Sequence, residues 1–502
     1  MSSRAVVPPR WWATRGVGDT LCLGLGVLIV CLLCTRDLWH GLDAYDFVGR
    51  FENGVLVNPR HPLYLPLAAL IVRPLVALGV PVFDAAVAAS SVGTALGCAL
   101  AHRAGLAAGL PRREALLATA AAAACFAVLY YGTVVEIHGV FLIAAGAAWW
   151  IAVRCARRPG VAAGALLGVV TGVGASIHAT GHVLLPAFAL FAAAQLGWRG
   201  LLRAWPAALA LLLLHAAVVA GLHLWLLPES VRHAPEPEAG AVSYLQHLRS
   251  FGTDWSCLPR TLWREWLAPF LPVSILALLA FLSRGQRRFG LAMVGAVVGY
   301  TVFTNMLLAP AGIVARPQYL PPFATMEYGA YLLPLVFPAA VLGLRLLPPR
   351  LRPWLPVLAL CWSLPHLFWS SRVPGDLAYA RDALAVMDRL DARLYCGGYD
   401  EFDGIKQLRP QADVHPVYEM HIVLASQPDI PFDHVTAWWH VQHAEVRRRG
   451  GEMLITDDAL SLMRATRDGL LDRLVDEYLP AHFRLEPVEK GRFRAFVVRA
   501  LP

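Results

Sequence analysis

The sequence predicts a polytopic α-helical membrane protein with about eleven transmembrane helices and a small C-terminal α/β domain outside the membrane. Of the 502 residues, 57% are hydrophobic and only 16% are charged, whereas a soluble domain carries about 25% charged residues. The apolar residues form blocks long enough to cross about 30 Å of hydrocarbon, and residues 371–502 lack such blocks. This composition excludes a soluble globular protein, a disordered chain and a nucleic-acid-binding domain.

The first apolar block follows a short basic stretch and could be mistaken for a signal peptide. It is too long for one and has no small-residue cleavage site, so we expect a retained transmembrane helix. The eleven candidate spans are residues 17–35, 84–101, 115–131, 138–153, 161–177, 182–197, 205–227, 266–282, 289–309, 330–347 and 354–370. Several are near the lower limit of ~17–25 residues for a span, so a merged or split pair would change the count.

The arginines predict the orientation of these spans, because short cytoplasmic loops retain Lys and Arg. With the N-terminus inside, the inner connections contain 17 arginines and two acids, Asp19 and Glu114, whereas the outer connections up to residue 330 contain nine arginines and twelve acids. We therefore expect a multi-pass protein of the cytoplasmic membrane, with its N-terminus inside and its C-terminal domain outside. The long first loop, 36–83, is then extracytoplasmic.

The change in composition predicts a transmembrane domain over residues 1–370 and an α/β domain over 371–502. The expected elements of the second are a helix over 377–394, strands at 393–396 and 453–456, a helix at 458–478 and a hairpin over 483–501 that turns at Lys490-Gly491. Cys257 and Cys396 are the only cysteines in polar stretches. They either pair with each other or remain two thiols.

The first outer loop contains two carboxylates, Asp43 and Asp46, in the segment Gly41-Leu42-Asp43-Ala44-Tyr45-Asp46-Phe47. Residues three apart lie on one face of a helical turn. The two side chains could share a proton, bind a cation, or supply a general base. An acidic, solvated loop that caps a helix is the equally simple alternative.

Shorter polar islands interrupt the outer ends of other spans. One contains Glu136 and His138, and the next contains His178, Thr180 and His182. A glutamate at the membrane boundary is costly unless it is paired or faces water. His178 and His182, four residues apart, could bind a metal or a phosphate, although histidines satisfied by backbone and water are the commoner outcome. The charge count places these islands and the acidic loop on the same side.

Together these motifs resemble the GT-C class of membrane glycosyltransferases, and within it the protein O-mannosyltransferase-like group. The resemblance covers roughly residues 15–200. It is carried by the acidic pair Asp43 and Asp46, the Pro62-Leu63-Tyr64 segment, Glu136 at the end of the third span, and His178 with Thr180 after the fifth. The chain departs from the group before Pro-Leu-Tyr, where a fuller His-Pro-Pro-Gly is replaced by Val57-Asn58-Pro59-Arg60 and then His61.

The resemblance implies an inverting enzyme that moves a sugar from a polyprenyl-phosphate carrier to a hydroxyl of a glycan, lipid or protein on the outer face. Asp43 or Asp46 would be the general base, and no nucleotide is expected. The departing phosphate needs a donor-rich clamp, or a divalent cation held by the carboxylates. The candidate substrate-binding residues are Arg60, His61, Tyr64, Glu136, His138, His178, Thr180 and Arg316. For Arg316 the alternative to substrate binding is an arginine whose side chain extends to the lipid headgroups.

Two other classes fit parts of the sequence. A secondary transporter or lipid-linked-glycan flippase would also have many spans with few polar islands, and His215 and His223 inside the seventh span favour it. The acids, however, cluster at outer boundaries, which favours the enzyme. A non-catalytic scaffold is the third class, because Trp438-Trp439-His440 could form a carbohydrate-stacking patch, or else belong to a buried strand or helix.

Overall fold

The protein is described here by a computed structural model. It describes residues 16–35, 41–58, 61–227, 259, 262–303, 329–370, 377–397, 399–409, 411–417, 420, 430–465 and 470–501. Three residues singled out by the sequence, Arg60, Arg316 and Cys257, lie outside these ranges, and for Asp43 only the backbone is described. Cys396 is buried in a strand, and its pairing with Cys257 stays a prediction.

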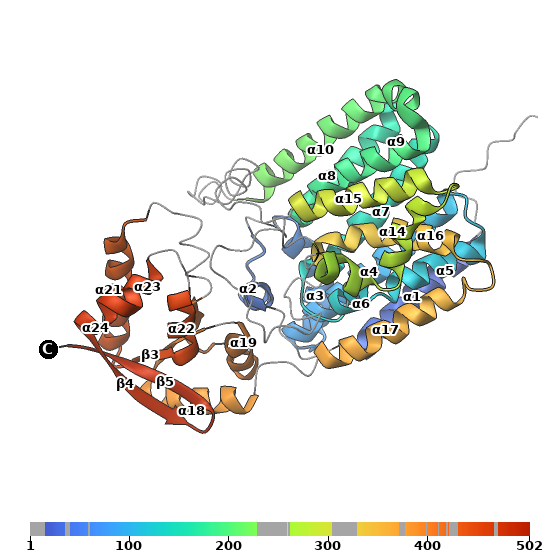
Figure 1. Cartoon of the computed structure of the whole chain (residues 1–502). Helices are drawn as coiled ribbons and strands as arrows, with labels where there is room; N and C mark the ends of the chain where they lie inside the picture. The colour runs from blue at the N-terminus through green and yellow to red at the C-terminus, as the bar shows by residue number, and fades with distance from the viewer. Residues whose placement is uncertain are drawn as a thin grey trace, which may run out of the picture.

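Helices form the described chain up to residue 370 (Figure 1). They are α1 (Val17–Leu33), α2 (Gly41–Glu52), α3 (Tyr64–Ala77), α4 (Val82–Ala107), α5 (Arg112–Ala123), α6 (Phe126–Tyr131), α7 (Ile137–Arg157), α8 (Val161–Ile177), η1 (Ala179–Val183), α9 (Leu184–Arg203), α10 (Trp205–Leu226), η3 (Leu262–Leu267), η4 (Ala268–Phe270), α14 (Val273–Leu279), η5 (Ala280–Leu282), α15 (Arg287–Phe303), η7 (Ala330–Leu335), α16 (Val336–Leu346) and α17 (Trp354–Ser370).

Every predicted apolar block contains helix, but the blocks differ in how well they could cross a membrane. Within the described part of the chain, four helical segments are long and apolar enough, and a bent pair would make a fifth. The third block is divided into α5 and α6 at Cys125, which has an extended backbone. The eighth bends by 109° between Phe270 and Val273, where Pro272 has no N–H to continue the helical hydrogen bonds. The count of eleven spans therefore stays a prediction.

Glycines let α8 and α10 approach closely. Gly164, Gly168 and Gly172 recur every four residues along one face of α8. A Cβ on Gly168 would collide with the carbonyl oxygen of Leu211, and one on Gly172 would lie 2.9 Å from the carbonyl oxygen of His215. Small residues at this spacing allow transmembrane helices to pack backbone against backbone. The packing fixes His215 beside α8.

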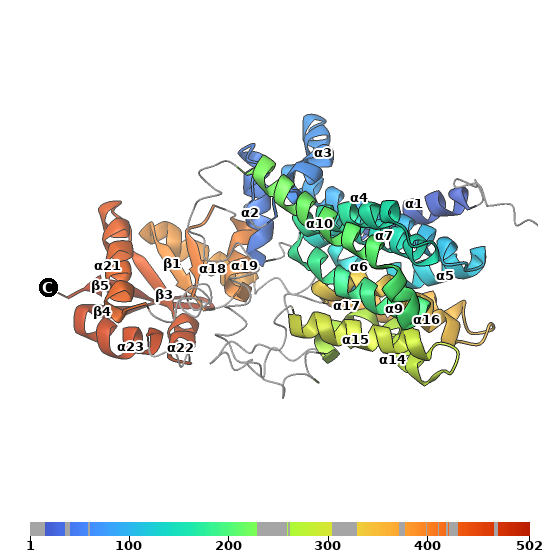
Figure 2. The same ribbon diagram turned by 90° about the horizontal axis from the view of Figure 1, so that it is seen from above.

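The first loop is folded against the bundle by two helices, α2 and α3. The buried side of α2 consists of Ala44, Phe47 and Val48, and the ring of Phe47 lies 4.6 Å from that of Tyr64 at the start of α3. The N–H of Leu63 donates to the carbonyl oxygen of Ser176 at the end of α8 (3.0 Å). Figure 2 shows α2 on the side of the bundle that faces the C-terminal elements. The acidic segment is thus helical and anchored.

The C-terminal elements form one mixed sheet with helices around it. They are α18 (Leu377–Leu390), β1 (Arg393–Cys396), α19 (Tyr399–Leu408), β2 (Val414–Pro416), α21 (Phe432–Arg448), β3 (Met453–Thr456), α22 (Asp457–Ala465), α23 (Leu471–Arg473), η8 (Leu474–Tyr478), α24 (Leu479–His482), β4 (Phe483–Lys490) and β5 (Phe493–Ala500). The strand order is β2-β1-β3-β5-β4. β1 pairs with β2 and β3 in parallel, whereas β5 is antiparallel to β3 and β4.

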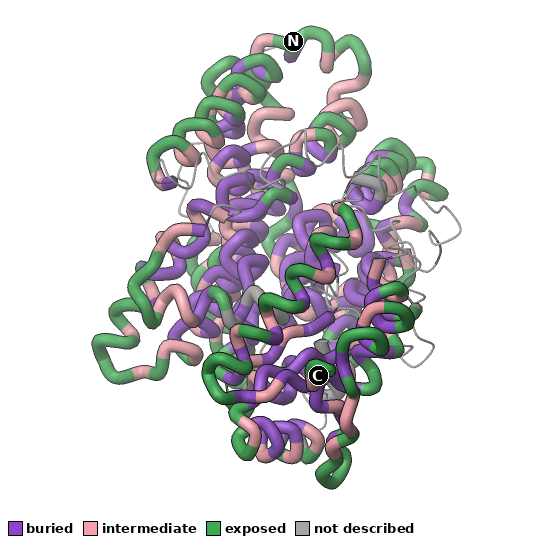
Figure 3. The backbone as a smooth tube through the Cα atoms, turned by 90° about the vertical axis from the view of Figure 1, so that its left-hand side faces the viewer, coloured by how far each residue is buried: buried purple, intermediate pink, exposed green. Residues whose placement is uncertain are grey.

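Buried side chains form one core in the helical bundle and separate cores on the two sides of the C-terminal sheet. Figure 3 shows buried backbone concentrated in the interior and exposed backbone on outward-facing helices. The predicted strands at 393–396 and 453–456 and the predicted hairpin are present. Gly491 at the hairpin turn has a positive φ of 55°, which suits glycine. The small C-terminal sheet is confirmed, and the division at residue 370 stays a prediction.

Candidate functional site

Histidines from three polar islands meet at one end of the bundle, which the arginine distribution predicts to face outward and which we name the outer end. The ring of His61, before α3, stacks on that of His178 with centroids 5.2 Å apart. The ring of His138, in the first turn of α7, lies 4.5 Å from that of His178. Tyr331 in η7 is 5.8 Å from His178 and 5.9 Å from His138. We call these four residues the histidine cluster.

Glu136 lies beside this cluster at the N-terminus of α7. Its Oε2 accepts from the backbone N–H of Ile137 (2.8 Å), and its Oε1 is 3.7 Å from Nε2 of His138. The hydroxyl of Ser90 in α4 donates to its carbonyl oxygen (3.1 Å). Only 6% of Glu136 is exposed. A carboxylate at a helix N-terminus interacts favourably with the N–H groups and the helix dipole, so the sequence can bury this acid at the membrane boundary.

The hydrogen bonds of His178 determine which ring nitrogen carries its proton. The backbone N–H of Thr180 donates to Nδ1 (3.2 Å), and the Thr180 hydroxyl is 2.7 Å from the same atom. Since Nδ1 accepts, the neutral imidazole carries its proton on Nε2. His178 and Thr180 are both buried. The His-x-Thr spacing therefore orients His178 so that Nε2 is a hydrogen-bond donor.

The acidic pair lies on α2, where Phe47 contacts Tyr64, and the N–H of Tyr64 donates to the carbonyl oxygen of His61 in the cluster (3.1 Å). Positions 43 and 46 are both helical, three residues apart. Asp46 is exposed, and its Oδ2 accepts from Nε of Arg50 one turn later (2.6 Å). Tyr64 itself is fully buried. The structure thus joins Tyr64, His61, Glu136, His138, His178 and Thr180, while the side chain of Asp43, with Arg60 and Arg316, lies outside the described part.

His178 and His182 do not come together as a ligand pair. Nδ1 of His182 lies 2.9 Å from Nε2 of His215, whose Nδ1 is 3.0 Å from the Thr171 hydroxyl. His215, which favoured transport, is therefore hydrogen-bonded within the bundle. No group of three or more His, Cys, Asp or Glu side chains suited to a metal occurs within the described ranges. That search does not test a cation held by Asp43 and Asp46, because the Asp43 side chain is not described.

Sequence reasoning missed Tyr331 and Ser90. Tyr331 belongs to the segment Gly329-Ala330-Tyr331 at the start of the tenth block, and an aromatic with a glycine at a span end was the available signal. Gly329 has a φ of 81° and its N–H donates to the buried Glu265 (2.9 Å). That contact joins η3 and η7 and helps to hold Tyr331 near the histidines. Ser90 lies inside an apolar span, where nothing in the local pattern indicates a partner.

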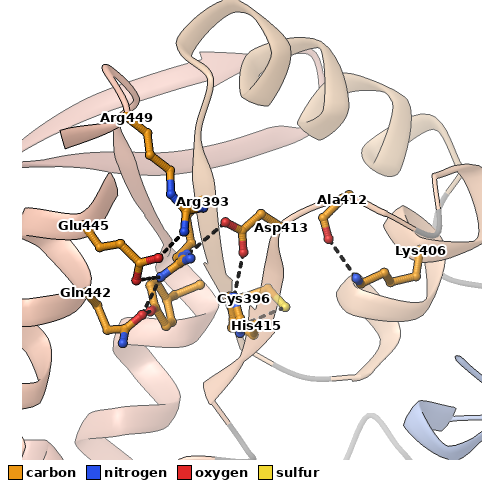
Figure 4. Close-up of polar contacts among 10 residues, drawn as sticks. Arg393, Cys396, Lys406, Ala412, Asp413, His415, Gln442, Glu445 and Arg449 are labelled. Carbon is orange, nitrogen blue, oxygen red and sulfur yellow. Dashed lines mark hydrogen bonds and ion pairs between the residues drawn. The ribbon is translucent and has the colours of Figure 1, made fainter. Parts of the chain in front are cut away.

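The C-terminal sheet contains a second polar group, centred on Arg393 in β1 (Figure 4). The guanidinium donates to Asp413 (2.9 Å), to Gln442 and to Glu445 (3.4 Å). Asp413 also lies 2.7 Å from Nε2 of His415. Burial by itself would raise the pKa of Asp413, but the hydrogen bonds from His415 and Arg393 outweigh it and lower the pKa to about 2. These contacts join β1, β2 and α21.

The aromatic run near this group lies on α21 and is not a strand. Trp439 is fully buried, whereas 37% of Trp438 is exposed and His440 is also exposed. The rings of Trp438 and Tyr395 meet edge to face at 6.1 Å. One indole is therefore a core residue, and the other is available at the surface.

Comparison with known proteins places the fold. No family model matches the chain, and no curated relative matches it. The crystal structure of ArnT from Cupriavidus metallidurans in the apo state is similar over 96% of this chain and 98% of that chain, with a TM-score of 0.52 and 13% identity. The structure of the same ArnT bound to undecaprenyl phosphate is similar over 97% and 98%, with a TM-score of 0.52 and 14% identity. At 13% and 14% identity this likeness shows a shared fold. The chain has the fold of ArnT.

Proposed function

We propose that this protein is a membrane glycosyltransferase that moves a sugar from a polyprenyl-phosphate carrier to an acceptor hydroxyl on the outer face of the membrane. One observation carries the proposal: three polar islands, separated by up to 117 residues from His61 to His178, supply one cluster, in which His138 and His178 are buried, in a chain with the ArnT fold. The ArnT structure that binds undecaprenyl phosphate supports a polyprenyl-linked donor here. The protein O-mannosyltransferase-like resemblance supports transfer of a hexose or pentose.

In this proposal the histidine cluster holds the phosphate of the donor. Charge builds up on the phosphate oxygens as the bond to the sugar breaks, and preorganised donors stabilise that charge. The Nε2–H of His178 is one such donor, because Thr180 occupies Nδ1. Glu136 lies 3.7 Å from His138, where a carboxylate orients the imidazole. Arg60 and Arg316 are proposed to supply further positive charge.

The acidic helix α2 supplies the base in the same proposal. The acceptor hydroxyl loses its proton to a carboxylate as its oxygen attacks the anomeric carbon from the face opposite the phosphate, which inverts that carbon. Asp46 already accepts a charge-assisted hydrogen bond from Arg50, which occupies one of its carboxylate oxygens. We therefore assign the base role to Asp43 and a positioning role to Asp46 with Arg50.

Transfer by purified protein tests this assignment. The probes are undecaprenyl-phosphate hexose and pentose with radiolabelled sugars, and an envelope extract supplies the acceptors. Loss of a general base typically costs about 10²–10⁴-fold in rate, so we expect that loss for Asp43→Asn and a smaller one for Asp46→Asn. Asp84→Asn is the matched control, since Asp84 lies in the first turn of α4, outside the acidic helix. Near wild-type transfer by both α2 variants would end the proposal.

Proteoliposomes loaded with the same donor separate an enzyme from a flippase. An enzyme releases the sugar to the acceptor with no protein-dependent movement of carrier between leaflets. Movement without transfer would instead identify a transporter. Labelling of intact cells at residues 36–83 checks whether this loop faces outward, as the proposed enzyme requires.

A further inference from the structure

A second feature of the bundle lies far from the histidine cluster. A cavity of about 410 Å³ is lined by the last turns of α4 and α7, by most of α9 and α16, and by the first turns of α8, α10 and α15. On α7 it is lined by residues from Trp149 to Arg157, 13 or more residues beyond Glu136, which corresponds to about 20–30 Å along the helix axis. Figures 1 and 2 show α9, α10 and α15 along one side of the bundle. The arginine distribution predicts this end to face the cytoplasm.

The sequence explains why this part of the bundle is hollow. Ten of the lining residues are alanines, and Gly105 also lines the cavity. Because these side chains are small or absent, the facing helices leave space between them. One wall is firmly held: Nε1 of Trp149 donates to the carbonyl oxygen of Pro334 (2.6 Å), and its ring packs edge to face on Phe188 and Phe191 at 4.7 and 5.2 Å. Protein interiors rarely leave such space empty, and the volume is within the range of ligand pockets.

The charged residues at the cavity all have one sign. Arg157 at the end of α7 and Arg345 near the end of α16 line it, with the amide of Gln195, and no acidic residue does. Both arginines are exposed, and neither forms an ion pair with any other residue that the structure describes. A Cβ on Gly109 would lie 2.7 Å from Nη2 of Arg157, so this guanidinium rests against the turn after α4. Guanidinium groups bind phosphate with charge-assisted, often bidentate hydrogen bonds.

A second cavity, elsewhere in the described part of the bundle, differs in this respect. It has a volume of about 600 Å³ and lies between α1, α3 and α4, and its only charged lining residue is Asp84. An apolar lining with a carboxylate does not suit a phosphate. Of these two cavities, the one at the opposite end combines an apolar lining with arginines.

We propose that the cavity lined by Arg157 and Arg345 binds one anionic glycerophospholipid of the cytoplasmic leaflet. One acyl chain lies among the alanines and against Trp149, while the phosphate lies at the two guanidinium groups. Basic pockets between transmembrane helices on the cytoplasmic side are suited to anionic head groups. The lipid fills space that the side chains leave between α7, α9, α10 and α16, so that its loss loosens this half of the bundle. The site takes no part in sugar transfer.

Native mass spectrometry of the detergent-purified full chain tests the proposal, with phosphatidylglycerol and phosphatidylcholine of the same acyl chains as probes. We expect one tightly bound phosphatidylglycerol and weaker binding of phosphatidylcholine. Arg157→Ala with Arg345→Ala should weaken phosphatidylglycerol binding on the order of tenfold for each arginine removed. The matched control, Arg158→Ala with Arg350→Ala, removes the same charge from neighbouring exposed positions that do not line the cavity, and should bind as wild type does.

A variant that fills the cavity gives an independent check. Ala192→Trp should abolish the tight phosphatidylglycerol site while leaving the lipid-free thermal midpoint no lower than that of the wild type, because it occupies open space. Equal binding of the two phospholipids, an equal loss in the control pair, or undiminished binding by Ala192→Trp would each overturn the proposal. Displacement of phosphatidylglycerol by undecaprenyl phosphate at equal concentration would assign the cavity to the carrier and overturn it also. None of these readouts depends on glycosyl transfer.

Discussion

The helical bundle and the C-terminal sheet bury polar groups in different ways. In the bundle, His138, His178 and Glu136 are almost inaccessible and are held at helix ends by backbone groups and hydroxyls. In the sheet, the central group is Arg393, which is surrounded by carboxylates that are about one-third exposed. Desolvating a charge is expensive, so a region with little water tolerates few ionisable groups. Those in the bundle are therefore the stronger indicators of function, and those in the sheet are explained by structure.

The sharpest test of this contrast compares two histidines four residues apart. His178→Gln should lower the rate of transfer from an undecaprenyl-phosphate sugar by about 10²–10³-fold, as expected for removal of one donor to developing charge. His182→Gln should change it only a few-fold, since His182 bonds to His215. The rates are measured at saturating donor, with protein yield and thermal midpoint as folding controls. Equal losses in the two variants would show that the cluster has no special role.

A second test concerns packing rather than chemistry. Gly168→Ala places a Cβ against the carbonyl oxygen of Leu211, and overpacking of this kind costs about 1–3 kcal/mol. Gly221→Ala in α10 is the control, because nothing lies near its added Cβ, and alanine is the better helix former by about 1 kcal/mol. Thermal unfolding in detergent should show a lower midpoint for the first variant only. A lower midpoint for both would mean that close α8–α10 contact is not what the glycines provide.

The smallest expected effect is the acid sensitivity of the sheet. Asp413 has a pKa of about 2 in the folded chain, against about 3.9 for an unfolded aspartate. Because folding lowers the pKa, the carboxylate stabilises the fold fully above about pH 4, and this contribution is lost as the pH falls toward 2. Hydrogen exchange of β1 and β2 in the full chain should speed up over that window in the wild type. Asp413→Asn should be less protected at pH 6 and change less on acidification.

Asp388 is the matched control for that measurement. It pairs with Arg409, and both side chains are about half exposed, so solvent screens the interaction. Asp388→Asn should exchange almost as the wild type does throughout. An effect as large as that of Asp413→Asn would mean that surface charge as a whole, and not the Arg393 group, governs the acid response.

Much of the site could be anticipated because its residues break an otherwise apolar pattern. Glu136, His138, His178 and Thr180 stand out at span ends in the sequence, and they do meet. Ser90 could not be found in this way, because a serine in a span is ordinary, and for Tyr331 the only signal was an aromatic next to a glycine at a span end. His182 stands out in the sequence as much as His178 does, but it does not join the cluster, because its hydrogen-bond partner is His215 on α10.

The sequence by itself determined the apolar, largely helical character of the first 370 residues and the strands of the C-terminal sheet. Each of these depends on how a local segment partitions between water and hydrocarbon or satisfies its own backbone. The tertiary structure alone decided that His61 stacks on His178, that the eighth block bends, and that alanines from distant helices enclose a cavity beside Arg157 and Arg345. These features depend on packing between segments far apart in the chain, and local composition does not specify which segments become neighbours.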